Sequence, residues 1–262
     1  MIFPVEFKLW HLTVSAHQVL EVAGYAAGSA LFVALRRRFA GPSLADERGL
    51  WVIVGCLAGA ALGSKVLAIL ESLHAYWPVY NQPGLLLGGK TIVGGLAGGW
   101  AGVEIAKHAV GIRQSTGDRF VFPILIGLAI GRVGCFLEGL PDHTYGVATS
   151  LPWGVNFGDG VRRHPTQLYE VVFCVLLAIG LLFYLRRKRP AGELFQLFAL
   201  WYFLWRFAVE FIKPRETYGG LSPIQMVCIV AALAAARNIH RLRRQSRDPS
   251  TPAPIAAGGA GG

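Results

Sequence analysis

Charged residues are scarce in this sequence of 262 residues, where they make up 15% of the total. An average soluble domain carries about a quarter. Hydrophobic residues make up 53%, and the mean hydropathy is +0.47. The apolar residues are gathered in long runs, which an ordinary soluble domain does not contain. The composition therefore predicts a protein that crosses a membrane several times.

Cysteine is also rare, and the four cysteines show no C-x-x-C spacing. Each lies in an apolar stretch, at Cys56, Cys135, Cys174 and Cys228. Isolated cysteines in apolar surroundings behave as small hydrophobic residues. The pattern therefore favours buried thiols over a disulfide framework or a zinc-binding motif.

Acidic residues number 15 against 25 lysines and arginines, which gives a formal net charge of +10. A basic balance of this size would suit nucleic acid, but seven apolar runs exclude a soluble nucleic-acid-binding protein. Each run is long enough to cross a bilayer as a helix. We therefore expect an all-α integral membrane protein with seven transmembrane helices. The expected spans are 16–35, 51–71, 87–106, 120–137, 167–185, 193–212 and 222–240.

The basic residues lie mainly in the segments that follow the odd-numbered spans, at 36–48, 107–119, 186–189 and 237–247. Lysine and arginine concentrate in cytoplasmic loops of membrane proteins. This asymmetry predicts an N-terminus outside and a cytoplasmic C-terminus. We expect residues 1–245 to form one membrane domain, and residues 246–262 (SRDPSTPAPIAAGGAGG) to form a disordered cytoplasmic tail.

Four basic residues lie in the outer half of an expected span: Lys65, Lys90, Arg132 and Arg206. A charge at the bilayer centre costs about 2.5–3.5 kcal/mol on insertion scales, so it marks a candidate functional site. Long side chains that reach the headgroups explain the two lysines equally well. The two arginines lie in apolar surroundings and suit a phosphate. They predict a pocket for a phospholipid headgroup, entered from the outer leaflet.

Tyr202, Arg206 and Glu210 recur every four residues in the sixth expected span. Positions i, i+4 and i+8 lie on one face of a helix. Glu210 is therefore placed to orient Arg206. The alternative interpretation is an Arg–Glu pair that only joins helices.

One segment, GLLLGGKT at 84–91, formally matches the phosphate-binding loop of nucleotide hydrolases. That loop needs a preceding buried strand, whereas this segment enters an expected span. The glycines continue at Gly94, Gly98 and Gly102, a spacing of four that is typical of closely packed membrane helices. We therefore expect a thin, tightly packed helix here and no nucleotide site.

The longest expected outer segment runs from 138 to 166 and contains His143 and His164. Its length and polarity are typical of a lid over a site. Either histidine could act as a base. The alternative is a pair of interfacial histidines that are hydrated and have no catalytic role.

Five stretches together carry a resemblance to a known family. They are GRVGCF at 131–136, YG at 145–146, LPWGVNF at 151–157, RHPTQLYE at 163–170 and YFLWRFAVEFIKP at 202–214. In this order they resemble the prolipoprotein diacylglyceryl transferase family, with likeness from about the first span to the seventh. The resemblance implies a bacterial inner-membrane enzyme whose active site faces the outer leaflet.

The resemblance also implies the reaction. The family moves the diacylglyceryl group of phosphatidylglycerol onto the lipobox cysteine thiol in the signal-peptide region of a prolipoprotein, and releases glycerol-1-phosphate. We expect no cofactor, metal or nucleotide. The implied catalytic residues are Arg206, Tyr202 and Glu210, to which we add His143 and His164 of the outer segment as candidate bases. The implied lipid-binding residues are Arg132, Arg206, Tyr25, Gly146 and Gln167.

The sequence departs from the family pattern at two positions. Val93 stands where the family commonly has a histidine, and Cys135 stands where it usually has asparagine. If that histidine is the base for the thiol, another group must replace it here, such as His143, His164 or Glu138. Two alternatives remain open: a diverged transferase with the same lipid donor and another acceptor, and a non-catalytic lipid-binding protein or transporter.

Overall fold

The computed structural model describes residues 3–10, 12–35, 39, 43–73, 89–214 and 216–247. Within these ranges the chain forms seven α-helices of 17 residues or more, one for each expected span. They are α1 (Ala16–Leu35), α2 (Glu47–Glu71), α5 (Ile92–Val110), α6 (Val121–Glu138), α7 (Thr166–Tyr184), α8 (Glu193–Val209) and α9 (Pro223–Arg247). Helix α9 ends at Arg247, and residues 248–262 of the expected tail lie outside the described residues.

Six of these helices are long and apolar enough to cross a membrane, and α5 is the exception. Its five glycines contribute little hydropathy, and Glu104 and Lys107 lower its mean. The structure therefore confirms a mainly helical protein, in which six of the described helices could span a membrane.

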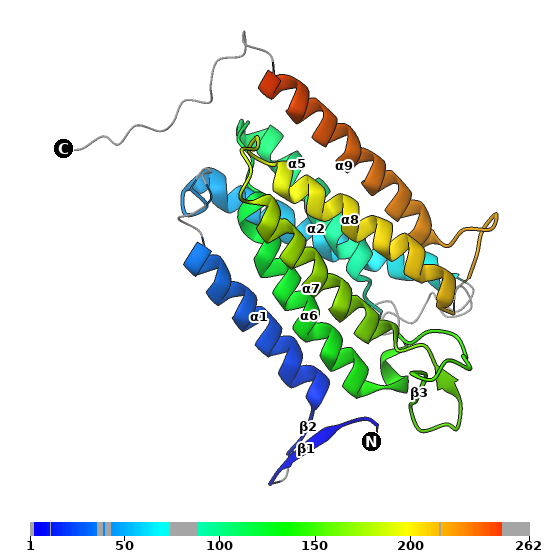
Figure 1. Cartoon of the computed structure of the whole chain (residues 1–262). Helices are drawn as coiled ribbons and strands as arrows, with labels where there is room; N and C mark the ends of the chain where they lie inside the picture. The colour runs from blue at the N-terminus through cyan, green and yellow to red at the C-terminus, as the bar shows by residue number, and fades with distance from the viewer. Residues whose placement is uncertain are drawn as a thin grey trace.

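The long helices pack side by side as a bundle (Figure 1). Helices α6, α7 and α8 pack in sequence order, while α1 packs on α6, α9 on α8 and α2 on α5. Three short 3-10 helices complete the helical structure: η2 (Asp118–Phe120), η3 (Leu140–Asp142) and η4 (Glu210–Ile212). Because η4 directly follows α8, the two together cover the expected span 193–212.

Two small antiparallel hairpins lie at one end of the bundle, which we call the hairpin end (Figure 1). Strands β1 (Glu6–Leu9) and β2 (Leu12–Ser15) precede α1, and β3 (Val155–Asn156) and β4 (Arg162–Arg163) precede α7. The sequence interpretation did not foresee these strands. They fix the segments that enter α1 and α7, so they shape the end of the bundle at which α6 ends.

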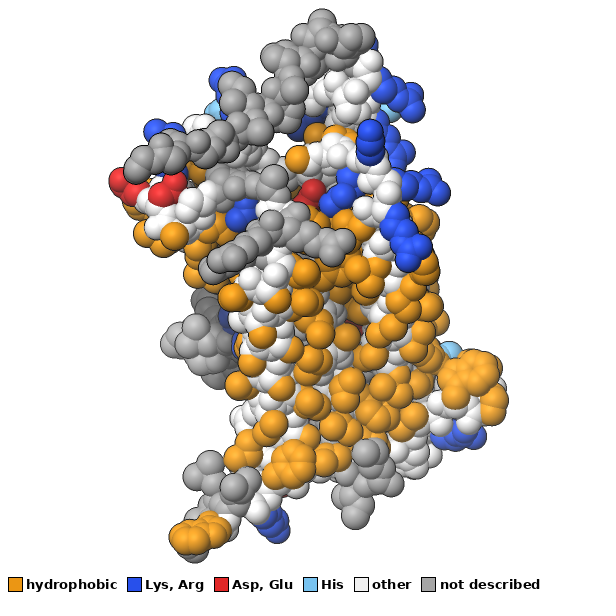
Figure 2. Space-filling view, turned by 60° about the vertical axis from the view of Figure 1, so that its left-hand side comes forward, with side chains coloured by type: hydrophobic (Ala, Val, Ile, Leu, Met, Phe, Trp, Pro, Cys, Tyr) orange, Lys and Arg blue, Asp and Glu red, His pale blue; other side chains and the backbone are white. Residues whose placement is uncertain are grey.

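The outer face of the bundle is apolar over most of its length. Figure 2 shows a broad band of hydrophobic side chains, with lysine and arginine gathered mainly beyond it at the end opposite the hairpins. Leu57, Leu62, Leu176, Val230 and Leu233 are each more than 60% exposed. Large apolar side chains exposed in such numbers are typical of a surface that faces lipid.

Helices α2 and α5 approach each other through matched glycines, Gly59 on α2 and Gly98 on α5. A Cβ added to Gly98 would lie 2.2 Å from the carbonyl oxygen of Gly59, and one added to Gly59 would lie 2.3 Å from that of Gly98. These contacts confirm the closely packed helix that the glycine spacing predicts. Thr91 is the last residue of the rejected nucleotide motif, and its side chain caps α5 by accepting a hydrogen bond from the Gly94 amide at 3.2 Å. Residues 84–88 of that motif lie outside the described residues.

Substitution at this crossing should separate the two helices. We expect Gly98→Ala to destabilise the protein by about 1–3 kcal/mol, because the added methyl group meets backbone that must move. Thermal unfolding in detergent measures the change. The matched control is Gly180→Ala, since a Cβ at Gly180 on α7 meets no atom of the described chain within 4 Å. Equal stability of the two variants would contradict the close packing.

Candidate functional site

A cluster of buried polar side chains lies between α6, α7 and α8. Its members are Arg132 from α6, Glu170 from α7, Tyr202 and Arg206 from α8, and Glu210 at the start of η4. Each is 5% exposed or less. Burying ions is costly unless they are paired, so their partners show how the cluster is stabilised.

Glu170 is the centre of this cluster. Its Oε2 atom lies 2.9 Å from Arg132 Nε and 3.3 Å from Arg206 Nη1. Its Oε1 atom accepts a hydrogen bond from the Tyr202 hydroxyl at 2.6 Å. One carboxylate therefore joins both arginines and the tyrosine. Glu170 lies within RHPTQLYE, but its role cannot be predicted from the sequence, because the pairing with α6 and α8 is not visible in local sequence.

The residues of the expected stripe, Tyr202 and Arg206 on α8 and Glu210 at the start of η4, all belong to this buried cluster. Arg206 Nη2 lies 3.3 Å from Glu210 Oε2, so Glu210 orients Arg206 as expected. Tyr202 reaches Glu170 instead of the arginine. The two guanidinium groups face two carboxylates, which makes the cluster close to neutral if both acids are ionised.

Several polar atoms beside these pairs have no hydrogen-bond partner among the described residues. They include Arg206 Nε, Glu210 Oε1 and both amide atoms of Gln167, whose side chain is 1% exposed. A buried amide without partners costs free energy. These atoms are therefore available to a bound polar group, and Gln167 lies three residues before Glu170 on α7.

Lys213 adds a further positive group just after η4. It is half-buried, and burial, followed by the positive charge of Arg206, lowers the pKa of its ammonium to about 8. Lys213 lies near the end of the stretch YFLWRFAVEFIKP, but the sequence alone predicts no role for it. Lys65 and Lys90 lie elsewhere: Lys65 Nζ donates to the Gly89 carbonyl at 3.1 Å, and Lys90 is exposed before α5.

Gly146 fixes the outer loop to the bundle. Its amide donates to the His164 carbonyl at 2.9 Å, and the next amide, of Val147, donates to Ile212 at 2.8 Å. A Cβ at Gly146 would lie 2.7 Å from both the Ile212 carbonyl oxygen and the His164 Cβ. Gly146, a predicted lipid-binding residue, therefore lies where the outer loop packs closely against Ile212 of η4.

Three other predicted site residues lie apart from the buried cluster. Tyr25 is 69% exposed on α1, and its hydroxyl donates to Glu21 at 2.9 Å. His143 is exposed at the end of η3. His164 is half-buried, and its Nδ1 lies 3.1 Å from the hydroxyl of Tyr169. The structure thus brings neither histidine into contact with the arginines.

The two departures from the family pattern lie in different surroundings. Val93 is 1% exposed and packs among apolar residues that include Leu67 and Phe203, so this position offers no base. Cys135 is buried beside the cluster, with Sγ 3.9 Å from Arg132 Nη1. It also lies beside two residues that the sequence interpretation missed.

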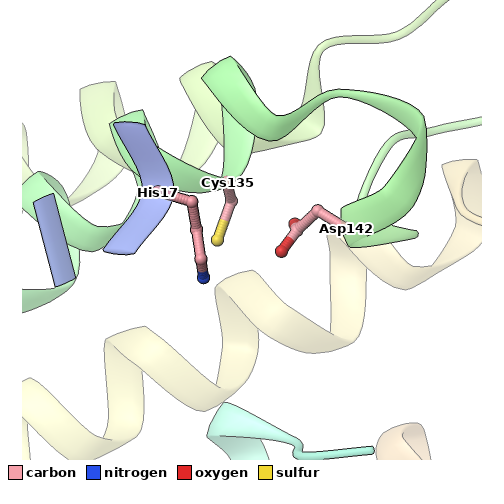
Figure 3. Close-up of side chains that lie close together, drawn as sticks. All are labelled: His17, Cys135 and Asp142. Carbon is pink, nitrogen blue, oxygen red and sulfur yellow. The ribbon is translucent and has the colours of Figure 1, made fainter. Parts of the chain in front are cut away.

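Those two residues are His17 from α1 and Asp142 from η3. Each offers a ligand atom, as does Cys135, and the three atoms lie within 4.8 Å of one another. Figure 3 shows the three side chains pointing into one space. A histidine, a thiol and a carboxylate form a set that can bind a transition metal. No sequence spacing could have revealed it, because His17 is far from the other two along the chain.

Loss of Glu170 should destabilise the protein strongly. We expect Glu170→Ala to lower the free energy of unfolding by about 3–5 kcal/mol, because two buried arginines lose a shared counter-ion. Thermal unfolding in detergent measures this loss. Asp159→Ala is the control, since its pair with Arg163 is at the surface, where ion pairs contribute about 0–1 kcal/mol. A smaller loss for Glu170→Ala than for the control would contradict the central role of Glu170.

Comparison with known proteins bears on what this cluster does. The family model for prolipoprotein diacylglyceryl transferase matches residues 4–240. A phosphatidylglycerol–prolipoprotein diacylglyceryl transferase of Geobacter sulfurreducens is 35% identical over 83% of this chain and 85% of its own length. A protein of the same name from Dehalococcoides mccartyi is 30% identical over 93% of this chain and 95% of its own length. Another from Azotobacter vinelandii is 33% identical over 89% of this chain and 91% of its own length. The chain therefore belongs to the prolipoprotein diacylglyceryl transferase family.

Proposed function

We propose that this chain transfers the diacylglyceryl group of phosphatidylglycerol to the lipobox cysteine thiol of prolipoproteins and releases glycerol-1-phosphate. The names of the relatives support this substrate pair. The observation that carries the proposal is the pair of buried arginines, Arg132 and Arg206, held on two helices by one carboxylate. Such a pair is suited to a single anion that reaches both helices.

The lipid phosphate binds between the two guanidinium groups. Arginine presents planar, bidentate donors that match phosphate oxygens. The phosphate competes with Glu170 for some of these donors, and Arg206 Nε and the Gln167 amide are available without any exchange. The shared carboxylate therefore keeps both arginines oriented while it leaves donors for the lipid.

The arginines also act on the leaving group. The acceptor thiolate attacks carbon 3 of the diacylglycerol moiety and forms a carbon–sulfur bond. The bond from that carbon to the phosphate oxygen breaks, and glycerol-1-phosphate leaves with the electron pair. Charge grows on the departing phosphate, where fixed cations in a dry site stabilise it most. The thiol must lose its proton first, because a free thiol ionises only near pH 8.5.

The proposed topology has seven spans, with an extracytoplasmic N-terminus and a cytoplasmic C-terminus. Helices α1 and α7 begin at the hairpin end, α6 ends there, and α9 ends at the opposite end (Figure 1). The basic side chains gather mainly at that opposite end (Figure 2). The positive-inside rule then supports a hairpin end that faces outward, in the bacterial cytoplasmic membrane. The cluster would face the outer leaflet, and residues 1–245 would act as one membrane domain.

A second candidate function is a transferase that uses the same lipid donor and another acceptor. Val93 favours it, because the family commonly has a histidine there and this chain lacks that base. A lipid-binding protein without catalysis is the candidate from another class. The products distinguish the three candidate functions. The proposed transferase gives a lipidated lipobox peptide, a transferase with another acceptor gives a different lipidated product, and a lipid-binding protein binds lipid without forming a product.

Loss of either arginine should abolish transfer. We expect Arg132→Ala and Arg206→Ala to reduce the rate at least about a hundredfold, the typical loss when one transition-state donor is removed. Mass spectrometry of a lipobox peptide incubated with phosphatidylglycerol and purified protein measures the diacylglyceryl mass increase. Arg187→Ala is the control, because Arg187 is exposed outside the helices. Full activity in both arginine variants would remove the phosphate-binding role.

Lipid binding should weaken as the pH rises through about 8. Lys213 is protonated below its lowered pKa of about 8 and neutral above it, so its attraction for a phosphate disappears on the alkaline side. The charged groups that act on it are Arg206, Glu210, Arg132 and Glu71. Affinity for short-chain phosphatidylglycerol, measured between pH 6.5 and about 9.5, reports the effect.

The two controls for this titration are variants of the same residue. Lys213→Arg should keep affinity constant across the range, because arginine stays charged. Lys213→Met should bind weakly at every pH. An unchanged pH profile in Lys213→Met would show that another group causes it.

A further inference from the structure

The strongest feature outside the anion cluster is the triangle of His17, Cys135 and Asp142 (Figure 3). Their ligand atoms lie within 4.8 Å of one another. In a tetrahedral zinc site, with bonds of about 2.0–2.3 Å, ligand atoms lie roughly 3.4–3.7 Å apart. Small side-chain rotations therefore bring all three onto one ion.

The backbone around the triangle is fixed by hydrogen bonds between distant segments. Ser15 ends β2 and directly precedes α1; its hydroxyl donates to Glu138 at the end of α6 and accepts from the His17 amide at 3.0 Å. This contact sets the start of α1 against the last turn of α6, where Cys135 lies. Gly139 then turns the chain with φ 74°, and η3 returns Asp142 toward the same place. The three ligands thus belong to anchored elements.

Two of the three ligands, His17 and Asp142, also have a neighbour of the kind that supports metal ligands. His17 Nδ1 is buried without a hydrogen-bond partner in the described part of the chain, and its Nε2 lies 3.9 Å from a carboxylate oxygen of Glu21. The Asp142 carboxylate accepts a hydrogen bond from the Thr144 hydroxyl. Histidine ligands typically have a carboxylate or carbonyl behind the second ring nitrogen, and ligating carboxylates are hydrogen-bonded in turn.

The donor set identifies the ion. One nitrogen, one sulfur and one carboxylate oxygen suit Zn²⁺, which accepts all three ligand types in tetrahedral geometry. Hard cations such as Mg²⁺ and Ca²⁺ prefer oxygen ligands alone. Three protein ligands leave the fourth position open, the arrangement of a catalytic zinc site.

We propose that His17, Cys135 and Asp142 bind Zn²⁺ and that its open position takes the thiol of the acceptor cysteine. This inference rests on the proposed transferase function for the identity of the acceptor. Coordination releases the thiol proton to water, because a metal-bound thiol is deprotonated. The bound thiolate then forms the carbon–sulfur bond as the carbon–oxygen bond to the phosphate breaks. No electron is gained or lost overall, and the leaving glycerol phosphate takes the electron pair.

Two observations connect this ion to the transfer reaction. Arg132 borders both sites, with Nε 2.9 Å from Glu170 and Nη1 3.9 Å from Cys135 Sγ, so nucleophile and leaving group would meet beside one residue. Val93 offers no base at the position where the resemblance implies a histidine, and a metal-activated thiol does not need one. The zinc site departs from two sequence-based expectations: that no metal is involved and that Cys135 is only a small buried residue.

Metal binding is tested first, without any measurement of activity. We expect the purified full chain to hold one Zn²⁺ and, after exchange with Co²⁺, to show thiolate-to-cobalt absorption. Cys135→Ser, His17→Ala and Asp142→Asn should each weaken metal affinity by more than about a hundredfold, beyond the loss typical of supporting residues. Cys56→Ser and His108→Ala are the controls, and both should bind like the parent protein.

Cys135→Ser and Asp142→Asn keep the size of the side chain, so thermal unfolding in the same detergent should show folded protein. Folded Cys135→Ser with unchanged zinc content and affinity would overturn the site. A parent protein that takes up neither Zn²⁺ nor Co²⁺ would overturn it as well.

The acceptor is tested with cobalt-loaded protein and a lipobox peptide, in the absence of lipid. The peptide should increase the thiolate-to-cobalt absorption, and the same peptide with serine in place of cysteine should not. Unchanged absorption with the cysteine peptide would contradict coordination of the acceptor.

Transfer assays on metal-loaded and metal-stripped protein then separate this inference from the proposed function. Transfer that requires zinc supports both. Undiminished transfer by fully stripped protein would reject the zinc role and leave the transferase function standing. Zinc and peptide binding without any transfer would support the site and reject the transferase function.

Discussion

The carboxylate of Glu170 between Arg132 and Arg206 is the interaction on which the rest of the structure depends. It pairs with two cations that are 5% and 3% exposed, with Glu210 as the second counter-ion of Arg206, and it joins α6 and α8 through α7. Buried charges of one sign on neighbouring helices would otherwise repel one another and lack solvation. The same pairing fixes where an anion can bind, because it determines the direction of each guanidinium group.

Local sequence patterns predicted those features that depend on one helix at a time. Apolar run lengths located the seven long helices of the described residues. The spacing of Gly94, Gly98 and Gly102 predicted a close helix contact whose partner, α2, only the structure identifies. The stripe of Arg206 and Glu210 could be predicted because residues four apart share a helix face. Periodicity carries this information without any knowledge of the fold.

Contacts between distant segments could not be predicted in this way. Glu170 lies 38 positions from Arg132, and His17 is separated from Cys135 by most of the first half of the chain, so neither pairing leaves a local pattern. Gly146 and Tyr25 were assigned to lipid binding by resemblance, whereas Gly146 packs against Ile212 and Tyr25 is exposed. A motif marks a residue as important to a family but does not say what the side chain touches.

The two departures from the family pattern are related through chemistry. Val93 offers no base at the position where the resemblance implies a histidine, and Cys135 places a thiol beside Arg132 in a group of three residues that could bind a metal. Under the proposed mechanism one change compensates for the other, because a metal ion ionises the acceptor thiol that the histidine would have deprotonated. The lipid phosphate and the acceptor sulfur would then both be held next to Arg132.

An experimental structure with bound phosphatidylglycerol tests the central claim most directly. The account predicts lipid phosphate oxygens at about 2.7–2.9 Å from guanidinium nitrogens of both Arg132 and Arg206, the usual length of a charge-assisted hydrogen bond. It also predicts that Glu170 keeps contact with at least one of the two. A phosphate bound at another place, with both arginines still paired only to Glu170 and Glu210, would contradict it.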